Sequence, residues 1–230
     1  MEQIIQGLKA AKCFLWDFDG CFADTERLHF LAYSEAFARF GHTLNEAEYY
    51  PSFTHLGEGT QREIASRCPH VSELEVLQIK AHAYHNLINE ANVSCFPETR
   101  MLVEKMKDLG AKVAIASNSS EEDIRIVLGR SGFPVEWLDV IVGKSQSLRK
   151  KPAPDIFLHA LSLLDCNPDE AFVLEDSNRG LQAAAAARCQ SFWIRTAYNA
   201  GLESDEPHIA ALTHGQLLEL LTTAAAKARH

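Results

Sequence analysis

The chain has 230 residues, of which 47% are hydrophobic and 23% are charged, and these proportions exclude a disordered or fibrous protein. The 31 Asp and Glu residues outnumber the 22 Lys and Arg residues, which gives a formal net charge of −9. This charge disfavours a nucleic acid or an anionic membrane as the main partner.

The cysteines and the apolar segments exclude further classes of protein. The six cysteines form no Cys-x-x-Cys pair and have no short, regular spacing, which argues against a zinc module. The N-terminus lacks the pattern of a secretion signal, and no apolar run approaches the roughly 18 residues of a membrane span. We therefore expect a cytoplasmic protein with no membrane partner, and nothing in the sequence demands more than a monomer.

Most of the chain alternates between short apolar runs and amphipathic stretches. Runs rich in β-branched and aromatic residues predict buried strands at residues 13–16, 113–116, 140–142, 171–174 and 192–194. Between the later runs, apolar residues three or four apart predict helices. The alternation indicates an α/β fold, with a Rossmann-like parallel sheet whose two faces are covered by helices.

Residues 25–95 break this alternation. They contain helical patterns at 28–40 and 74–88 but no convincing strand. We interpret them as an α-helical cap inserted after the first strand, so that residues 1–24 and 96–230 form the core. Because ligands of open α/β sheets bind at the carboxyl ends of the strands, the cap is expected to roof the site.

Two aspartates follow the first strand. Side chains two positions apart on an extended chain project to the same side, so we expect the Asp17 and Asp19 carboxylates to lie together, with Gly20 permitting the turn that exposes them. Taken alone, the pair fits turn-forming residues before a helix about as well as it fits a chemical site.

Polar groups also follow the second predicted strand. Ser117 and Asn118 lie beside a helix start, where backbone N–H groups and the helix dipole can hold an anion. Ser119 with Glu122 matches a capping box, which gives Ser119 a structural explanation.

The third and fourth predicted strands are followed by charged groups. Lys151 precedes a Pro-x-Pro sequence that leads into a helix, although a solvated basic patch is the ordinary fate of two adjacent lysines. Glu175 and Asp176 end the fourth strand, and oxygen ligands at this edge of a sheet suit Mg²⁺. The four groups should converge, because the carboxyl ends of parallel strands lie at one edge of the sheet.

The four motifs are D-x-D-G, a Ser-containing loop, K-P-x-P-D and E-D-S-x-x-G, and they occur in this order at the predicted strand ends. This pattern closely resembles the haloacid dehalogenase superfamily over essentially the whole chain. Within it, the chain is most similar to the α-helical-cap branch that contains sugar phosphatases and β-phosphoglucomutase. The fold expected from the resemblance is the one already inferred from the periodicity.

The resemblance implies a role for each motif residue. Asp17 would be the nucleophile that forms an aspartyl-phosphate, and Asp19 would protonate the leaving group and then activate water. Ser117, Asn118 and Lys151 would hold the phosphoryl oxygens. The expected Mg²⁺ ligands are Asp17, the backbone carbonyl of Asp19, and Asp176, with Glu175 close by.

The retained second aspartate of D-x-D favours phosphate chemistry over dehalogenation. We therefore expect a Mg²⁺-dependent phosphatase that hydrolyses a small phosphorylated metabolite, a sugar or polyol phosphate. Two alternatives stay open, which are a phosphosugar mutase of the β-phosphoglucomutase type and a protein that only binds the phosphometabolite.

Three residues of the insertion bear on the choice between phosphatase and mutase. His29 falls where the mutase has a histidine that engages the acid/base aspartate. Glu58 takes the place of a mutase lysine that contacts a doubly phosphorylated intermediate, and a carboxylate there would repel the second phosphate. Together with Arg62, His29 and Glu58 are the candidates for contacting the leaving group. Because of Glu58, we predict the phosphatase rather than the mutase.

Overall fold

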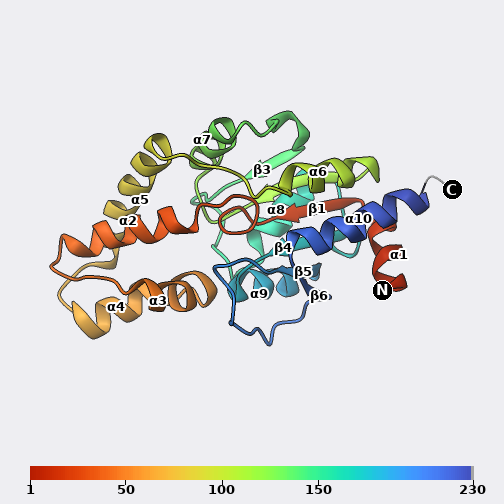
Figure 1. Ribbon diagram of the computed structural model, residues 1–230. Coiled ribbons are helices and arrows are strands. Elements are labelled where there is room, and N and C mark those ends of the chain that lie inside the picture. Colours follow the sequence, from red (N-terminus) through yellow and green to blue (C-terminus); the bar gives the residue numbers. More distant parts are fainter. Residues whose placement is uncertain (229–230) are drawn as a thin grey trace.

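In the computed structural model, which describes residues 1–228, a parallel sheet forms the centre of the molecule (Figure 1). The strand order among these residues is β3-β2-β1-β4-β5-β6. The strands are β1 (Cys13–Trp16), β2 (Lys112–Ala116), β3 (Val140–Val142), β4 (Ala171–Glu175), β5 (Gln190–Ile194) and β6 (Ala210–Leu212). The expected α/β fold with a Rossmann-like parallel sheet is confirmed, and each of the five predicted strands is present. Strand β6 was not predicted, because Ala-Ala-Leu carries neither a β-branched residue nor an alternating pattern.

Helices cover both faces of the sheet. This burial accounts for the continuously apolar sequence of strand β1. Phe14 and Trp16 pack into one hydrophobic cluster while Cys13 and Leu15 pack into another, so both faces of the strand are buried. The helices that cover this face and contribute to the first cluster are α1 (Glu2–Ala10), α6 (Thr99–Asp108), α7 (Glu121–Ser131) and α10 (His214–Ala228). The cluster also takes in side chains of α2 (Glu26–Ala38) and α5 (Glu73–Glu90). Those of the second are α8 (Asp155–Leu164) and α9 (Asn178–Ala186).

The remaining helices lie together at one end of the molecule, on the left of Figure 1. We call this part, residues 26–90, the helical insertion; it consists of α2 (Glu26–Ala38), α3 (Glu46–Tyr49), a π-helical turn (Tyr50–His55), α4 (Gly59–Arg67) and α5 (Glu73–Glu90). Phe30, Phe37, Tyr49 and Phe53 form part of a hydrophobic cluster of its own.

The two connections between the insertion and the sheet run side by side. The Asp24 N–H donates to the Ser94 carbonyl at 2.9 Å, and Ala23 and Cys95 form an antiparallel bridge. The chain therefore leaves and rejoins the sheet-bearing part at neighbouring positions.

Two short 3₁₀ helices (Val135–Trp137 and Pro168–Glu170) complete the secondary structure described for residues 1–228. Across the same range, no helix combines the length and the apolar character that crossing a membrane requires. All six cysteines are free thiols.

Candidate active site

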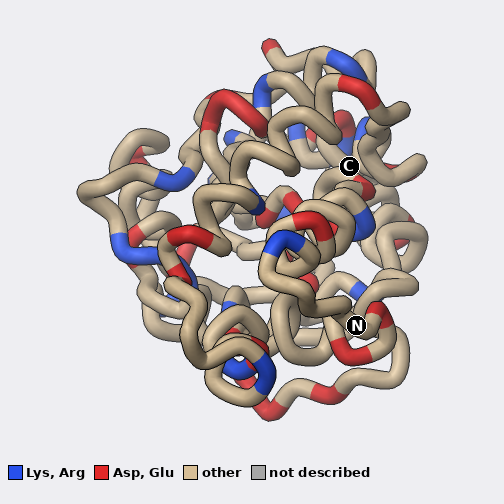
Figure 2. Tube along the Cα trace, turned by 90° about the vertical axis from the view of Figure 1, so that its left-hand side faces the viewer, with Lys and Arg blue, Asp and Glu red and all other residues tan. Residues whose placement is uncertain are grey.

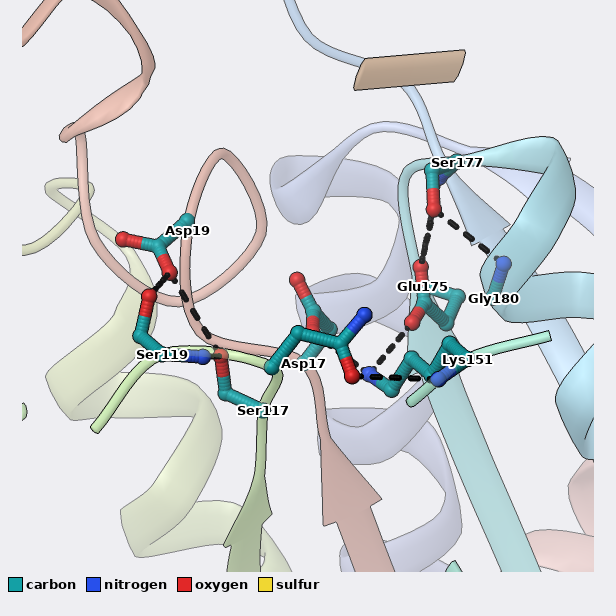
Figure 3. Close-up of polar contacts among 9 residues, drawn as sticks. Asp17, Asp19, Ser117, Ser119, Lys151, Glu175, Ser177 and Gly180 are labelled. Carbon is teal, nitrogen blue, oxygen red and sulfur yellow. Dashed lines mark hydrogen bonds and ion pairs between the residues drawn. The ribbon is translucent and has the colours of Figure 1, made fainter. Parts of the chain in front are cut away.

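Asp17 and Lys151 form a buried ion pair at the end of strand β1. The Asp17 N–H continues the strand ladder by donating to the Leu174 carbonyl at 2.9 Å, so the sheet fixes the backbone that carries the carboxylate. Lys151 Nζ lies 2.5 Å from Asp17 Oδ1 and is only 5% exposed as a residue (Figure 3). Burial and then the neighbouring Glu175 raise the pKa of Asp17 to about 7, against the opposing effect of Lys151.

Glu175 holds Lys151 from the other side. Its Oε1 lies 2.6 Å from Lys151 Nζ, and its Oε2 accepts from the Ser177 hydroxyl at 3.0 Å (Figure 3). Gly180 makes room for it, since a Cβ at that position would lie 1.8 Å from the Glu175 carboxyl carbon. Glu175 is fully buried with both oxygens engaged, which makes it a positioning residue for Lys151.

Asp176 completes a cluster of three carboxylates with Asp17 and Glu175, whose oxygens lie within 4.8 Å of one another. Lys151 neutralises only one of these charges. Asp176 is 2% exposed, and its Oδ2 has no hydrogen-bond partner among the described residues. An excess of buried negative charge and an orphaned carboxylate oxygen are the features that a hard divalent cation would satisfy, so the donor set fits Mg²⁺.

Asp19 points away from this cluster, contrary to the expectation that its carboxylate would lie beside that of Asp17. Oδ1 accepts from the Thr25 hydroxyl at 2.7 Å and from the Tyr84 hydroxyl at 3.0 Å. Oδ2 accepts from the Ser119 hydroxyl at 2.5 Å (Figure 3). The reason is local: strand β1 ends at Trp16 and the chain turns at Gly20 (φ +77°), so the alternation of an extended strand does not continue to Asp19.

These contacts set the charge of Asp19. Burial alone would raise the pKa of this carboxyl, but His29 and the hydrogen bonds from Ser119 and Thr25 outweigh burial and hold the pKa well below its usual range. Asp19 is therefore a carboxylate in this arrangement.

The loop after β2 corrects one expectation from the sequence. Ser120, not Ser119, caps helix α7, because its hydroxyl accepts from the Asp123 N–H at 3.1 Å. The helix cap is shifted by one residue, which frees Ser119 to bind Asp19. Ser117 is 2% exposed and accepts from the Ser119 N–H, while Asn118 Oδ1 accepts from the Lys151 N–H at 3.1 Å.

A cavity of about 190 Å³ lies between the sheet and the helical insertion. The strand ends line it with Asp17, Asp19, Ser117, Asn118, Ser119, Lys151, Glu175 and Asp176, to which Lys144, Lys150, Ser177 and Arg179 add further polar groups. The insertion contributes Glu26, His29, Tyr33, Tyr49, Phe53, Thr54, Leu77, Lys80 and Ala81. All seven predicted residues from the strand ends therefore share one cavity, and Ser119, for which the sequence offered only a capping role, joins them.

His29 is the predicted residue of the insertion that reaches this cavity. Its Nε2 lies 2.9 Å from Asp19 Oδ1, its Nδ1 lies 2.7 Å from Lys80 Nζ, and its ring stacks on Tyr84 with centroids 3.8 Å apart. Burial and then Lys80 lower the pKa of His29. Because an ammonium can only donate, neutral His29 accepts from Lys80 at Nδ1 and carries its proton at Nε2, which lies close to Asp19 but forms no hydrogen bond among the described residues.

Glu58 and Arg62 are not among the residues that line this cavity. Both are exposed, and Arg62 lines a separate cavity of about 420 Å³ inside the helical insertion. Because the Glu58 carboxylate lies outside the cavity, it gives no reason to favour the phosphatase over the mutase. The sequence alone was not enough to place Glu58 and Arg62.

Four contributing residues were missed in the sequence. Thr25 and Tyr84 bind Asp19, Lys80 binds His29, and Glu26 is a buried carboxyl that accepts from the Thr54 hydroxyl at 2.7 Å. Lys80 and Tyr84 lie four apart on α5, so the helical period could have placed them on one face. No signal in the sequence identifies which face meets the site.

Comparison with known proteins agrees with this geometry. Residues 14–194 match the family of haloacid dehalogenase-like hydrolases. The chain belongs to this family. The expected superfamily, and with it the expectation of an enzyme, are confirmed.

Among curated relatives, protein CbbY of Cereibacter sphaeroides is 32% identical over 189 residues, which are 77% of this chain and 82% of CbbY. The phosphorylated carbohydrates phosphatase of Thermotoga maritima is 26% identical, over 75% of this chain and 80% of that enzyme. The crystal structure of CbbY from Rhodobacter sphaeroides in complex with phosphate is similar to this fold, with a TM-score of 0.76 and 28% identity over 91% of this chain and 96% of that chain.

Proposed function

We propose that this protein is a Mg²⁺-dependent phosphatase that hydrolyses a small phosphorylated sugar or polyol through an aspartyl-phosphate on Asp17. The observation that carries the proposal is the arrangement at the end of β1, where the Asp17 carboxylate meets both a buried ammonium and a carboxylate cluster with a spare oxygen. The names of the phosphatase relatives support the substrate class.

Asp17 attacks the phosphorus of the substrate. A bond forms between a carboxylate oxygen and phosphorus while the phosphorus–oxygen bond to the sugar breaks. Lys151, held against Asp17 by Glu175, offsets the negative charge that the attacking carboxylate shares with the phosphoryl oxygens. Water then attacks the aspartyl-phosphate, releasing inorganic phosphate and restoring Asp17.

Asp19 moves the protons of both steps. As an acid it gives a proton to the departing sugar oxygen, and as a base it takes one from the attacking water. Its low pKa makes it a poor acid while Tyr84 and His29 remain bound, so substrate must displace one of these contacts before the first step. His29, with its proton at Nε2, is a positioning residue that orients Asp19.

Asp17 and Asp176 would hold Mg²⁺, together with the backbone carbonyl of Asp19, while Glu175 lies beside them. When bound, this ion would neutralise phosphoryl oxygens and orient them for attack. The carboxylates must be ionised to bind it, so its affinity should rise with pH.

The helical insertion acts as a cap in this proposal. It supplies His29, Lys80 and Tyr84 to the site, so substrate enters while the insertion and the strand ends are apart. Closure would then exclude bulk water from the phosphoryl group. The division into a core (residues 1–24 and 96–230) and a cap (residues 25–95) follows from this role.

One observation favours a mutase as the second candidate, which is the contact of His29 with Asp19 at 2.9 Å. The products distinguish the two activities. We would incubate the enzyme and Mg²⁺ with β-glucose 1-phosphate and catalytic glucose 1,6-bisphosphate and follow the phosphorus NMR spectrum. The phosphatase yields inorganic phosphate, whereas accumulation of glucose 6-phosphate without phosphate release would contradict the proposal.

The covalent intermediate needs its own test. An acid-quenched reaction, digested and analysed by peptide mass spectrometry, should show phosphorylation of the peptide that contains Asp17. Modification of another residue would refute the assignment of the nucleophile.

A further inference from the structure

His55 of the helical insertion has no role in the mechanism described so far. It ends the π-helical turn and is only 7% exposed, yet it is not among the described residues that line the active-site cavity. Both of its ring nitrogens contact backbone groups of the sheet-bearing part. Nε2 lies 3.0 Å from the Glu203 carbonyl oxygen, and the Asn178 N–H donates to Nδ1 at 3.3 Å. We call these two hydrogen bonds the docking contact.

The docking contact fixes where the ring carries its proton. A carbonyl oxygen can only accept and a backbone N–H can only donate, so Nε2 of His55 is protonated and Nδ1 is not. The contact with Asn178 therefore requires a neutral imidazole. Burial lowers the pKa of His55, which favours this neutral form.

Asn178 is the first residue of helix α9, and its N–H is one of those that a helix leaves without an intrahelical acceptor. Ser177 caps the helix by accepting from the Gly180 N–H at 3.2 Å. His55 accepts from the Asn178 N–H and so adds a second cap from the other part of the molecule. The insertion thereby completes the start of a helix that belongs to the sheet-bearing part.

The turn that His55 contacts also carries Asp176. The Asp176 carbonyl accepts from Trp193 Nε1 at 3.0 Å and from Asn199 Nδ2 at 2.9 Å. The His55 ring lies against the same indole, with ring centroids 6.0 Å apart. The backbone of this turn is thus held at Asp176 by the sheet-bearing part and two residues later by the insertion.

A second histidine of the insertion contacts the sheet-bearing part in a more exposed place. His85 Nδ1 lies 2.9 Å from Asp123 Oδ1, and the His85 side chain is 40% exposed, so this pair contributes little to holding the parts together. Seen from the side of the insertion, acidic and basic segments are interspersed over the molecule (Figure 2). Specific buried contacts, of which His55 makes two, are therefore better suited than charge to hold the insertion in one position.

We propose that His55 is a positioning residue that holds the closed insertion against the turn between β4 and α9 and thereby fixes the position of Asp176. The proposal rests on the proposed function in one respect, which is that Asp176 binds Mg²⁺. Because the docking contact exists only while the insertion is closed, closure and the ordering of the metal site would occur together. Outer groups that orient a metal ligand commonly change metal affinity by about 10-fold to 100-fold.

Acid should release the docking contact. A protonated Nδ1 would be a donor facing another donor, and its charge would lie at the N-terminus of α9, where the helix dipole disfavours a cation. The Glu203 carbonyl opposes the lowering of the pKa of His55, and Arg195 adds to it. Arg179 lies in the same turn of α9, His208 touches the indole that His55 contacts, and the Glu203 side chain is exposed. The usual pKa of histidine is 6.5, so the docked state is favoured above this pH and weakens as the pH falls below it.

Conservative variants separate the two ring nitrogens. In His55→Asn the amide oxygen takes the place of Nδ1 and can still accept from Asn178, whereas in His55→Gln the amide nitrogen takes the place of Nε2 and keeps only the contact with Glu203. His55→Ala removes both. His70→Ala, which changes an exposed histidine of the insertion, is the control.

Two measurements on the enzyme without substrate test the proposal. Hydrogen exchange of the Asn178 N–H, followed by NMR, should be about tenfold faster in His55→Ala and His55→Gln than in the wild type. Mg²⁺ affinity, measured by calorimetry, should be about tenfold lower in the same two variants. His55→Asn should stay within about threefold of the wild type in both, and His70→Ala should be unchanged. If His55 only filled space, the larger Gln would restore these properties better than Asn.

The dependence on pH provides a further readout. In the wild type the protection of the Asn178 N–H, relative to its intrinsic exchange rate, should fall as the pH is lowered from about 7.5 to 5.5. In His55→Asn it should stay constant, because the amide does not titrate. The same fall in both proteins would show that another group controls this turn, and would contradict the proposal.

The role of His55 and the proposed function fail in different ways. Equal exchange of the Asn178 N–H in wild type and His55→Ala, or Mg²⁺ affinities within twofold, would overturn the role of His55 even in an enzyme that releases phosphate. Protection that is lost in His55→Ala and His55→Gln but kept in His55→Asn, in a protein that binds no Mg²⁺, would support the docking contact and refute the Mg²⁺-dependent phosphatase.

Discussion

The cavity has two sides of different character. On the side of the strand ends, Lys151 lies within 2.6 Å of both Asp17 and Glu175, and the backbones of these residues are fixed by the sheet and the loops that follow it. On the side of the insertion, His29 and Lys80 project from helices that pack mainly on each other.

This difference in packing suggests a different role in the proposed reaction for each side. The buried, mutually satisfied groups at the strand ends are suited to a reaction that every substrate shares. In the proposed reaction, the groups on the insertion would contact the part of the substrate that carries the phosphate, so they can change with the substrate.

Lys151→Met removes the cation that Asp17 and Glu175 share. Two carboxylates would be left buried and unpaired, which costs about 3–5 kcal/mol of unfolding free energy. Turnover should fall at least about a thousandfold. Urea denaturation and phosphate release measure the two effects.

The loss of stability in Lys151→Met should be smaller at pH 6 than at pH 8, because the pKa of Asp17 is already about 7 and a protonated Asp17 relieves the repulsion. Lys12→Met, which breaks the exposed pair with Glu170, is the matched control and should leave stability unchanged within error. Equal losses in the two variants would contradict the account.

Gly180→Ala tests how closely the strand-end side is packed. The new Cβ would overlap the Glu175 carboxyl group, so we expect a loss of about 1–3 kcal/mol and weaker activity through displaced Lys151. Gly129→Ala in α7 meets no atom within 4 Å and should instead stabilise the protein by up to about 1 kcal/mol. Thermal unfolding of both variants checks the sign; two changes in the same direction would argue against the packing described.

Glu26→Gln tests the insertion side. Burial raises the pKa of Glu26 from 4.5 to about 7, so the native state keeps a proton that the unfolded state loses near pH 4.5. Stability should therefore fall as the pH rises from about 4.5 to 7, and the full penalty, at most about 3 kcal/mol, applies above that range.

The Gln variant lacks this titration and can still accept from Thr54. It should match the wild type at pH 5 and be more stable at pH 8, by urea denaturation in the presence of chelator. A difference that does not change with pH would show that Glu26 is ionised throughout.

Glu58→Gln and Arg62→Gln should have the smallest effects. Neither side chain lines the cavity, so KM and kcat for any phosphorylated substrate should stay within about twofold of wild type. A tenfold rise in KM for either variant would show that the residue contacts the substrate, as the sequence alone suggested.

The sequence predicted the strand-end side far better than the insertion side, for physical reasons. The carboxyl ends of parallel strands all lie at one edge of the sheet. The four predicted strands were therefore enough to place Asp17, Ser117, Lys151 and Asp176 together. The position of a helix face depends instead on tertiary packing, and Glu58 shows how sequence matching fails there.

The sequence alone also could not decide which serine caps α7 or predict strand β6. Ser119 and Ser120 each have an acidic residue three positions on, so either could cap α7. The contact of Ser119 with Asp19, 100 residues away, decides between them. Strand β6 is held by pairing with β5 and not by its own composition.

The most direct test of the central claim is release of inorganic phosphate from a panel of sugar and polyol phosphates and bisphosphates, by the wild type with Mg²⁺, by the wild type with chelator, and by Asp17→Asn with Mg²⁺. We predict release in the first case, and a loss of at least about a thousandfold in the other two. Release that persists in Asp17→Asn, with the folded state verified by circular dichroism, would contradict the assignment of Asp17 as the nucleophile and with it the proposed reaction.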